Sequence, residues 1–306
     1  MSRVGKYLDP KSDIVFKKIF GNRPHLLVHF LNSVLPLPAD GLIESLTYLT
    51  PEEVPTIPVL KRTIVDVKCK DQKGRYFIVE MQLEWMTGFM QRMLFNASQA
   101  YVKQLGKGEG YRTLCPVYGL GIVNAVFDHA SEEWYHHYQI VNVERPRQQL
   151  TGLEFVFLEL PKFKPSTHTE KRLQTLWLRF LSELDEKSVA ASEELLQVPE
   201  INEAVSLAEE SGYSVSELDT YYQYWDTVST EKTLMEGKYA EGEAKGRAEG
   251  KAEGKAVGKA EGKAEGHAQG AEEKADQIAR SMKASGMNIA DIARYTGFTE
   301  DEVKQM

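Results

Sequence analysis

The sequence predicts a sheet with helices before, within and after it, which is an α/β or α+β fold. Two observations lead to this prediction. The segments 63–70 and 76–83 are rich in β-branched and aromatic residues and alternate with period 2, as half-buried strands do. The segment 87–105 instead repeats its apolar residues with the 3.6-residue period of an amphipathic helix.

The remaining elements follow from local patterns along the chain. Capping residues and a terminal glycine indicate a short helix over 11–21, and a second helix is expected over 24–35. Prolines between 51 and 58 mark a loop before the two strands. Later elements are expected as strands at 117–127, 138–143 and 154–160, a helix at 170–184, and shorter helical pieces within 192–225.

Composition limits the class of protein. The chain has 306 residues, of which 42% are hydrophobic and 27% charged, as in ordinary soluble proteins with one large or two modest domains. Two cysteines, Cys69 and Cys115, are too few for a disulfide framework and favour a cytoplasmic location. No run of eighteen apolar residues and no signal-peptide core is visible, so we expect no membrane segment.

Three polar residues on the two predicted strands form the main candidate site. Asp66 lies on the first strand, and Glu80 and Gln82 lie on the second, after a polar break at 71–75 that indicates a hairpin loop. Glu80 and Gln82 share one face of the sheet because side chains alternate. If residue 66 pairs with residue 80, two carboxylates meet over that face, where a hard divalent cation could bind.

Basic residues surround the same hairpin, although the chain as a whole is acidic. A net charge of −8 argues against broad coating of nucleic acid but permits a local basic groove. The alternative is a solvated strand edge whose charges discourage aggregation. The cluster consists of Lys61, Arg62, Lys68, Lys70, Lys73 and Arg75.

A four-residue repeat places a glycine at every fourth position from Gly242 to Gly270. Each glycine costs about 1 kcal/mol of helix stability relative to alanine. The spacing also places lysine next to lysine and glutamate next to glutamate along the helix. In the regular part of the repeat, from Lys251 to Lys263, no lysine therefore meets a glutamate at i+3 or i+4. We therefore expect a spacer that is marginally helical by itself and is ordered by a partner copy.

The last segment, 275–306, predicts two short helices joined by a Thr-Gly turn, capped by Asn288 and Thr299, and it resembles a helix-turn-helix. Its second helix carries Glu300, Asp301 and Glu302. Because a DNA-reading helix needs Arg, Lys, Asn or Gln toward the bases, a packing or dimerisation module is the favoured interpretation.

The order of these motifs resembles a known family. Asp66, then Glu80-Met81-Gln82, preceded by the helix that begins at Asp13, is similar to the PD-(D/E)XK nuclease superfamily. Within it, residues 10–230 resemble the Rpn family of recombination-promoting nucleases and transposase-like proteins, whose members also end in such repeats and tails. The resemblance implies an α/β, restriction-endonuclease-like mixed sheet flanked by helices, with a helical repeat tail at the C-terminus.

The resemblance also implies a site and an activity, namely Mg²⁺- or Mn²⁺-dependent cleavage of DNA. The implied metal ligands are Asp66, Glu80 and the backbone carbonyl of Met81. Asp13 would complete the site or hold an attacking water, and the alternative is that it is simply a helix cap. Gln82 stands where lysine is usual in the superfamily and could orient a water but cannot act as a base.

Two basic residues are implied as possible phosphate contacts. Arg92 is the arginine that the family carries on the helix after the hairpin, and Lys68 could supply positive charge on the Asp66 face. Each has a simple alternative, which is exposure to solvent.

Two functional hypotheses follow. In the first, the chain is a metal-dependent DNA endonuclease of recombination, mobile elements or phage defence, and it self-associates through its tail. In the second, it is a catalytically degenerate nuclease fold that acts as a binding or scaffold module through the repeat. For both we expect a nuclease-like domain over 1–230, a repeat spacer over 231–272 and a small helical tail over 273–306.

Overall fold

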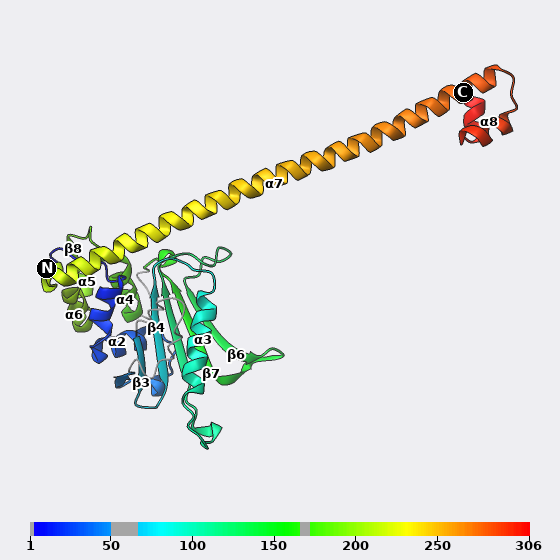
Figure 1. Cartoon of the computed structure of the whole chain (residues 1–306). Helices are drawn as coiled ribbons and strands as arrows, with labels where there is room; N and C mark the ends of the chain where they lie inside the picture. The colour runs from blue at the N-terminus through cyan, green and yellow to red at the C-terminus, as the bar shows by residue number, and fades with distance from the viewer. Residues whose placement is uncertain (1–2, 50–66, 166–171) are drawn as a thin grey trace. The chain divides into compact units, whose positions relative to one another are not determined.

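The computed structural model describes residues 3–49, 67–165 and 172–306. Within these residues, six strands form one mixed sheet in the order β2-β3-β4-β5-β7-β6 (Figure 1). Strands β4, β5 and β7 run parallel to one another, and the other neighbours are antiparallel. The strands are β2 Leu46–Tyr48, β3 Val67–Asp71, β4 Tyr76–Gln82, β5 Val117–Val123, β6 Tyr135–Asn142 and β7 Arg145–Glu159.

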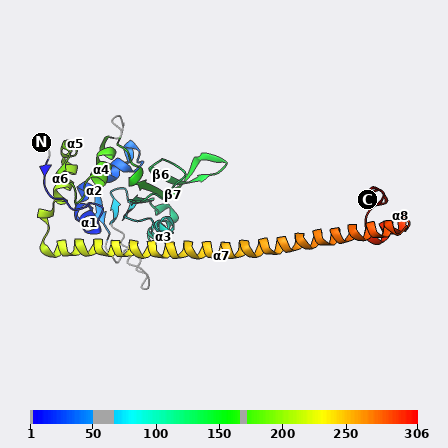
Figure 2. The same ribbon diagram turned by 90° about the horizontal axis from the view of Figure 1, so that it is seen from above.

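Helices cover both faces of this sheet. Helix α3 (Phe89–Val102) packs on one face, against Ile78, Val117 and Phe157. The other face carries the larger core, in which Phe77 and Val79 of β4 join the helices before and after the sheet (Figure 2). Those helices are α1 Asp13–Phe20, α2 Pro24–Val34, α4 Arg172–Glu183, α5 Glu193–Leu196 and α6 Pro199–Leu207.

The predicted fold class is confirmed, with differences in detail. The strand β2 and the two-stranded ladder of β1 (Arg3–Val4) with β8 (Ala190–Ala191) are too short to have been predicted. Strand β7 begins at Arg145, nine residues before the expected start. Its first half is exposed, so it lacks the alternation of apolar side chains by which strands are recognised.

The hairpin of β3 and β4 has the predicted connection. Lys70 pairs with Tyr76, and Val67 pairs with Val79, so five residues connect the paired positions. The predicted pairing of residue 66 with residue 80 requires this register, and residues 67–70 of β3 have it. Asp66 itself lies outside the described residues.

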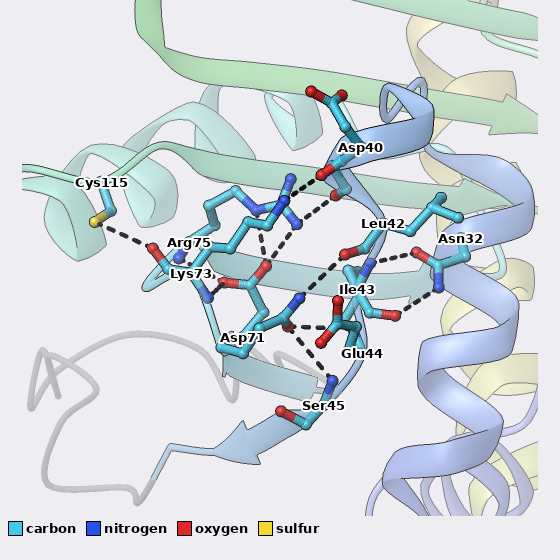
Figure 3. Close-up of polar contacts among 12 residues, drawn as sticks. Asn32, Asp40, Leu42, Ile43, Glu44, Ser45, Asp71, Lys73, Arg75 and Cys115 are labelled. Carbon is cyan, nitrogen blue, oxygen red and sulfur yellow. Dashed lines mark hydrogen bonds and ion pairs between the residues drawn. The ribbon is translucent and has the colours of Figure 1, made fainter.

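A buried ion pair closes the hairpin turn (Figure 3). The Asp71 carboxylate accepts hydrogen bonds from the backbone N–H groups of Lys73 and Arg75 at 3.0 and 2.8 Å and from Arg75 Nε at 2.7 Å. Arg75 Nη2 also donates to the carbonyl of Gly41 at 2.6 Å. Arg75 is therefore buried here and does not belong to a solvated basic edge.

The chain divides into two compact units, residues 1–227 and 228–306. Helix α7 runs from Val215 to Ala284, and its first turns bring Tyr221 into the core of the first unit. The glycine repeat is continuous helix with exposed side chains, although we expected only marginal helicity. None of the described helices has the length and apolar character needed to cross a membrane.

The second unit ends in α8 (Ile289–Thr296) and α9 (Glu300–Gln305), which pack on α7 around Ala279, Ile292 and Val303. The predicted caps are confirmed: Asn288 accepts a hydrogen bond from Ala290 N, and Thr299 forms a capping box with Glu302. The finer division into a spacer and a tail stays a prediction. Short 3-10 turns complete the fold at η1 Ala39–Gly41, η3 Tyr111–Thr113, η4 Leu160–Lys162 and η5 Glu210–Gly212.

Candidate active site

Polar side chains from β3, β4 and α3 gather on the α3 face of the sheet. Glu80 and Gln82 point to this face together, as predicted, because both accept hydrogen bonds from Arg92. Lys68 shares the face because it pairs with Ile78, which packs under α3. The group consists of Lys68, Glu80, Gln82, Arg92 and Asn96.

The packing of α3 places two of these residues. Phe89, Met93 and Ala97 form its buried stripe, and Arg92 and Asn96 form the neighbouring stripe at i and i+4. The helix can approach the sheet closely because β5 carries glycines below it. A Cβ atom on Gly121 would lie 2.6 Å from Phe157 and 3.0 Å from Phe89.

Glu80 is held from two sides. Its side chain is 1% exposed, and Asn96 Nδ2 donates to Oε1 at 3.0 Å while Arg92 Nη2 donates to Oε2 at 3.1 Å. The same Arg92 nitrogen donates to Gln82 Oε1 at 2.9 Å. The two residues of the Glu-x-Gln motif are thus joined through one guanidinium, and Arg92 does not simply face solvent, as its alternative interpretation required.

The group carries buried charges of both signs. Lys68 is also buried rather than solvated. Burial lowers the pKa of Lys68, and the nearby Glu80 carboxylate opposes that shift. Among the described residues of this group, Lys68 and Arg92 are the cations and Glu80 is the carboxylate, while the predicted partner Asp66 lies outside them.

The contacts described for Asp13 do not include any residue of this group. Its carboxylate pairs with Lys17 Nζ at 2.8 Å, one turn along α1. The helix cap is Ser12, so the interpretation of Asp13 as the cap is wrong. The described contacts do not join Asp13 to Glu80, and its part in the site stays a prediction.

The metal ligands can be tested only in part. Asp66 lies outside the described residues, and among the residues inside them no three His, Cys, Asp or Glu side chains are arranged to hold a metal. Glu80 fits the role of one ligand. A carboxylate has about four lone-pair sites, and the hydrogen bonds from Arg92 and Asn96 use two of them.

Sequence reasoning missed the contact of Asn96 with Glu80. Asn96 lies on the predicted amphipathic helix 87–105, four residues after Arg92, and that spacing was the available signal.

A second buried carboxylate, Glu159, was also missed. Glu159 is the last residue of β7, and across β5 it lies level with Gln82. Its carboxylate is hydrogen-bonded to Asp128 N and His136 Nε2, both at 3.0 Å, and to Phe127 N, and it forms an ion pair with Lys162 Nζ. Burial would raise the pKa of Glu159, but these hydrogen bonds outweigh it and lower the pKa. Nothing in the local sequence distinguishes this glutamate from a solvated one.

Comparison with known protein families finds a match over most of the chain. A family model described as PD-(D/E)XK nuclease family transposase matches residues 10–235. This range contains both strands of the hairpin and helices α1 and α3. No curated protein and no solved structure matches the chain.

Proposed function

This chain belongs to the PD-(D/E)XK nuclease family transposases, and from that premise we propose that it is a metal-dependent DNA endonuclease that hydrolyses phosphodiester bonds. The observation that carries the proposal is the buried Glu80 carboxylate, held by Arg92 and Asn96. A buried carboxylate with cations beside it suits a site that brings a phosphate and a hard cation together.

The proposed ligands of Mg²⁺ or Mn²⁺ are Asp66, Glu80 and the backbone carbonyl of Met81. When bound, such a cation would lower the pKa of water and neutralise charge on the phosphate. The hard oxygen atoms of this donor set are those that both cations prefer.

The protein side chains would position the reactants. Gln82 has no ionisable group, so it would orient a water or a phosphate oxygen through its amide. Arg92 would contact a phosphate oxygen from its place between Glu80 and Gln82, and Lys68 would add positive charge beside it. Asp13 would act only if its carboxylate broke its ion pair with Lys17 and turned toward the site.

The direct test is cleavage of supercoiled plasmid by the full chain with Mg²⁺ or Mn²⁺. We expect nicked and linear products from the wild type, and none from Asp66→Ala or Glu80→Gln. Glu132→Gln, at an exposed glutamate, is the matched control and should cleave as the wild type does.

The same assay separates the alternative function. Intact plasmid with the wild type, in either metal, would favour a catalytically degenerate fold that binds without cleaving. Equal cleavage by Asp66→Ala would instead show that the activity does not use the proposed ligands. The biological setting we propose is recombination, mobile-element movement or phage defence in the cytoplasm.

The repeat favours self-association of the protein. In the helical repeat, lysines such as Lys251 and Lys255 stack on one another at i+4, so their charges repel within the helix. The glutamate stripe lies on another side of the helix. A second copy can offer its glutamates to these lysines, which a single helix cannot do.

Light scattering coupled to size-exclusion chromatography tests this proposal. Replacement of the four repeat lysines, Lys251, Lys255, Lys259 and Lys263, by glutamate should reduce the mass to that of one chain. Replacement of the same lysines by arginine keeps the charge and should leave the assembly intact. A wild-type mass equal to one chain at all concentrations would contradict it.

A further inference from the structure

The hairpin of β6 and β7 continues beyond the sheet as an arm, which we define as residues 139–150. Strand β7 pairs with β5 only from Leu153 onward, and its earlier residues pair with β6 alone. All residues of the arm are exposed. Figures 1 and 2 show the arm projecting from the rest of the sheet.

The arm carries apolar side chains that no part of the described chain covers. The exposed fractions are 45% for Ile140, 90% for Val143 and 68% for Leu150. A two-stranded ribbon without a buried face is marginally stable in water. Both the exposure and the lack of a covering layer indicate that the arm contacts another molecule.

The polar residues of the arm are of the types that contact DNA. The arm contains two arginines, Arg145 and Arg147, against one carboxylate, Glu144, in a chain whose net charge is −8. Its remaining polar residues are amides: Gln139, Asn142, Gln148 and Gln149. Arginine and these amides form the bidentate hydrogen bonds that read base edges, and the major groove of B-DNA admits a two-stranded β-ribbon.

The amides are pre-arranged on the ribbon. Gln149 Nε2 donates to Gln139 Oε1 at 2.7 Å across the two strands, and Asn142 Oδ1 accepts the N–H groups of Glu144 and Arg145 at the turn. The ladder shifts register at Val141, which increases the local twist of the ribbon. The side chains are exposed, so a base edge could replace their mutual hydrogen bonds.

The position of the arm suits a duplex that also reaches the candidate active site. Because β4, β5 and β7 are parallel, Glu80 lies level with Phe157. From Phe157 back to Arg147 an extended strand spans about 33 Å at most. One turn of B-DNA is roughly 34 Å. A duplex that reached Arg92 beside Glu80 and ran over α3 in the direction of β7 would therefore meet the arm about one turn away.

We propose that the β6–β7 arm enters a groove of duplex DNA about one helical turn from the phosphate that Arg92 would contact. This rests on the proposed function only in taking DNA as the substrate. The arm takes no part in bond cleavage.

The test is fluorescence anisotropy of the full chain with a labelled 30-base-pair duplex, in EDTA so that cleavage does not occur. Arg145→Ala/Arg147→Ala should weaken binding at least tenfold and reduce the slope of log Kd against log salt by about 1 for each arginine. Lys6→Ala/Lys187→Ala removes the same charge from exposed sites near β1 and β8 and should bind as the wild type does. On a duplex of about ten base pairs the arm variant should match the wild type.

The outcomes separate this inference from the proposed function. Equal binding of the long duplex by the arm variant would overturn the arm as a DNA contact and leave the nuclease proposal standing. Loss of binding in the arm variant supports the arm even if the plasmid assay shows no cleavage. A wild type that binds no duplex overturns the arm as a DNA contact, and the plasmid assay with metal then decides the nuclease proposal by itself. A change in the mass of the assembly instead of in binding would assign the arm to a second copy and overturn it as a DNA contact.

Discussion

The side-chain amide of Asn96 donates a 3.0 Å hydrogen bond to Oε1 of Glu80, which joins the middle of α3 to the end of β4. Glu80 has no access to solvent that could replace this bond. The carboxylate proposed to bind metal is thus oriented by a helix that the sequence connected to the site only through Arg92. The position of α3 on the sheet therefore decides the geometry of the site.

Asn96→Leu should remove the hydrogen bond that orients the Glu80 carboxylate. The variant removes a donor from a buried carboxylate, which typically costs about 1–3 kcal/mol of unfolding free energy. Loss of a residue that orients a ligand typically weakens metal affinity about 10–100-fold. Thermal denaturation and Mn²⁺ titration measure the two effects. Ser98→Ala, on the exposed side of α3, should change neither.

Arg92→Lys keeps the charge but removes the planar guanidinium that spans Glu80 and Gln82. An ammonium group does not reproduce that geometry. We expect plasmid cleavage to fall at least tenfold, while DNA affinity in EDTA changes little. Arg112→Lys, at an exposed site, is the control. Wild-type cleavage by Arg92→Lys would show that charge alone is required there.

Lys68→Met should change the pH dependence of stability. Burial lowers the pKa of Lys68 from its ordinary value of 10.5. Between the lowered pKa and 10.5 the unfolded chain binds more protons, so the free energy of unfolding rises with pH in that window. The variant should lose this rise and melt higher at pH 7, yet cleave less. Lys70→Met, at an exposed position of β3, should keep the wild-type profile.

Gly121→Ala should displace α3. The new Cβ would lie 2.6 Å from Phe157 and 3.0 Å from Phe89, and such overpacking typically costs about 1–3 kcal/mol. The melting temperature and cleavage should both fall. Gly254→Ala is the contrasting control, because its Cβ meets nothing within 4 Å and the change should stabilise α7 by up to about 1 kcal/mol.

Arg75→Leu should destabilise the hairpin that presents Glu80. It leaves the fully buried Asp71 carboxylate without its partner, which typically costs about 3–5 kcal/mol. Chemical denaturation measures the loss. The double variant Asp71→Leu/Arg75→Leu should recover much of it, because no charge then remains buried. Equal stability of the single and double variants would contradict the ion pair as the cause.

Local patterns were sufficient to predict the hairpin and the caps of the tail. Alternation along a strand depends only on neighbouring residues, so the common face of Glu80 and Gln82 could be predicted, as could the connection between Lys70 and Tyr76. The capping roles of Asn288 and Thr299 depend on three or four consecutive residues, and they were predicted for the same reason.

The sequence by itself thus determined the family, the strands of the hairpin and the side chains that share a face, because each depends on short-range order along the chain. The tertiary structure alone decided that Asn96 and Arg92 hold Glu80, that Glu159 is buried with four donors, and that β7 extends into an exposed arm. These features depend on parallel strand pairing and on the close approach of α3 over Gly121. Such contacts join residues far apart in the chain, and no local pattern encodes them.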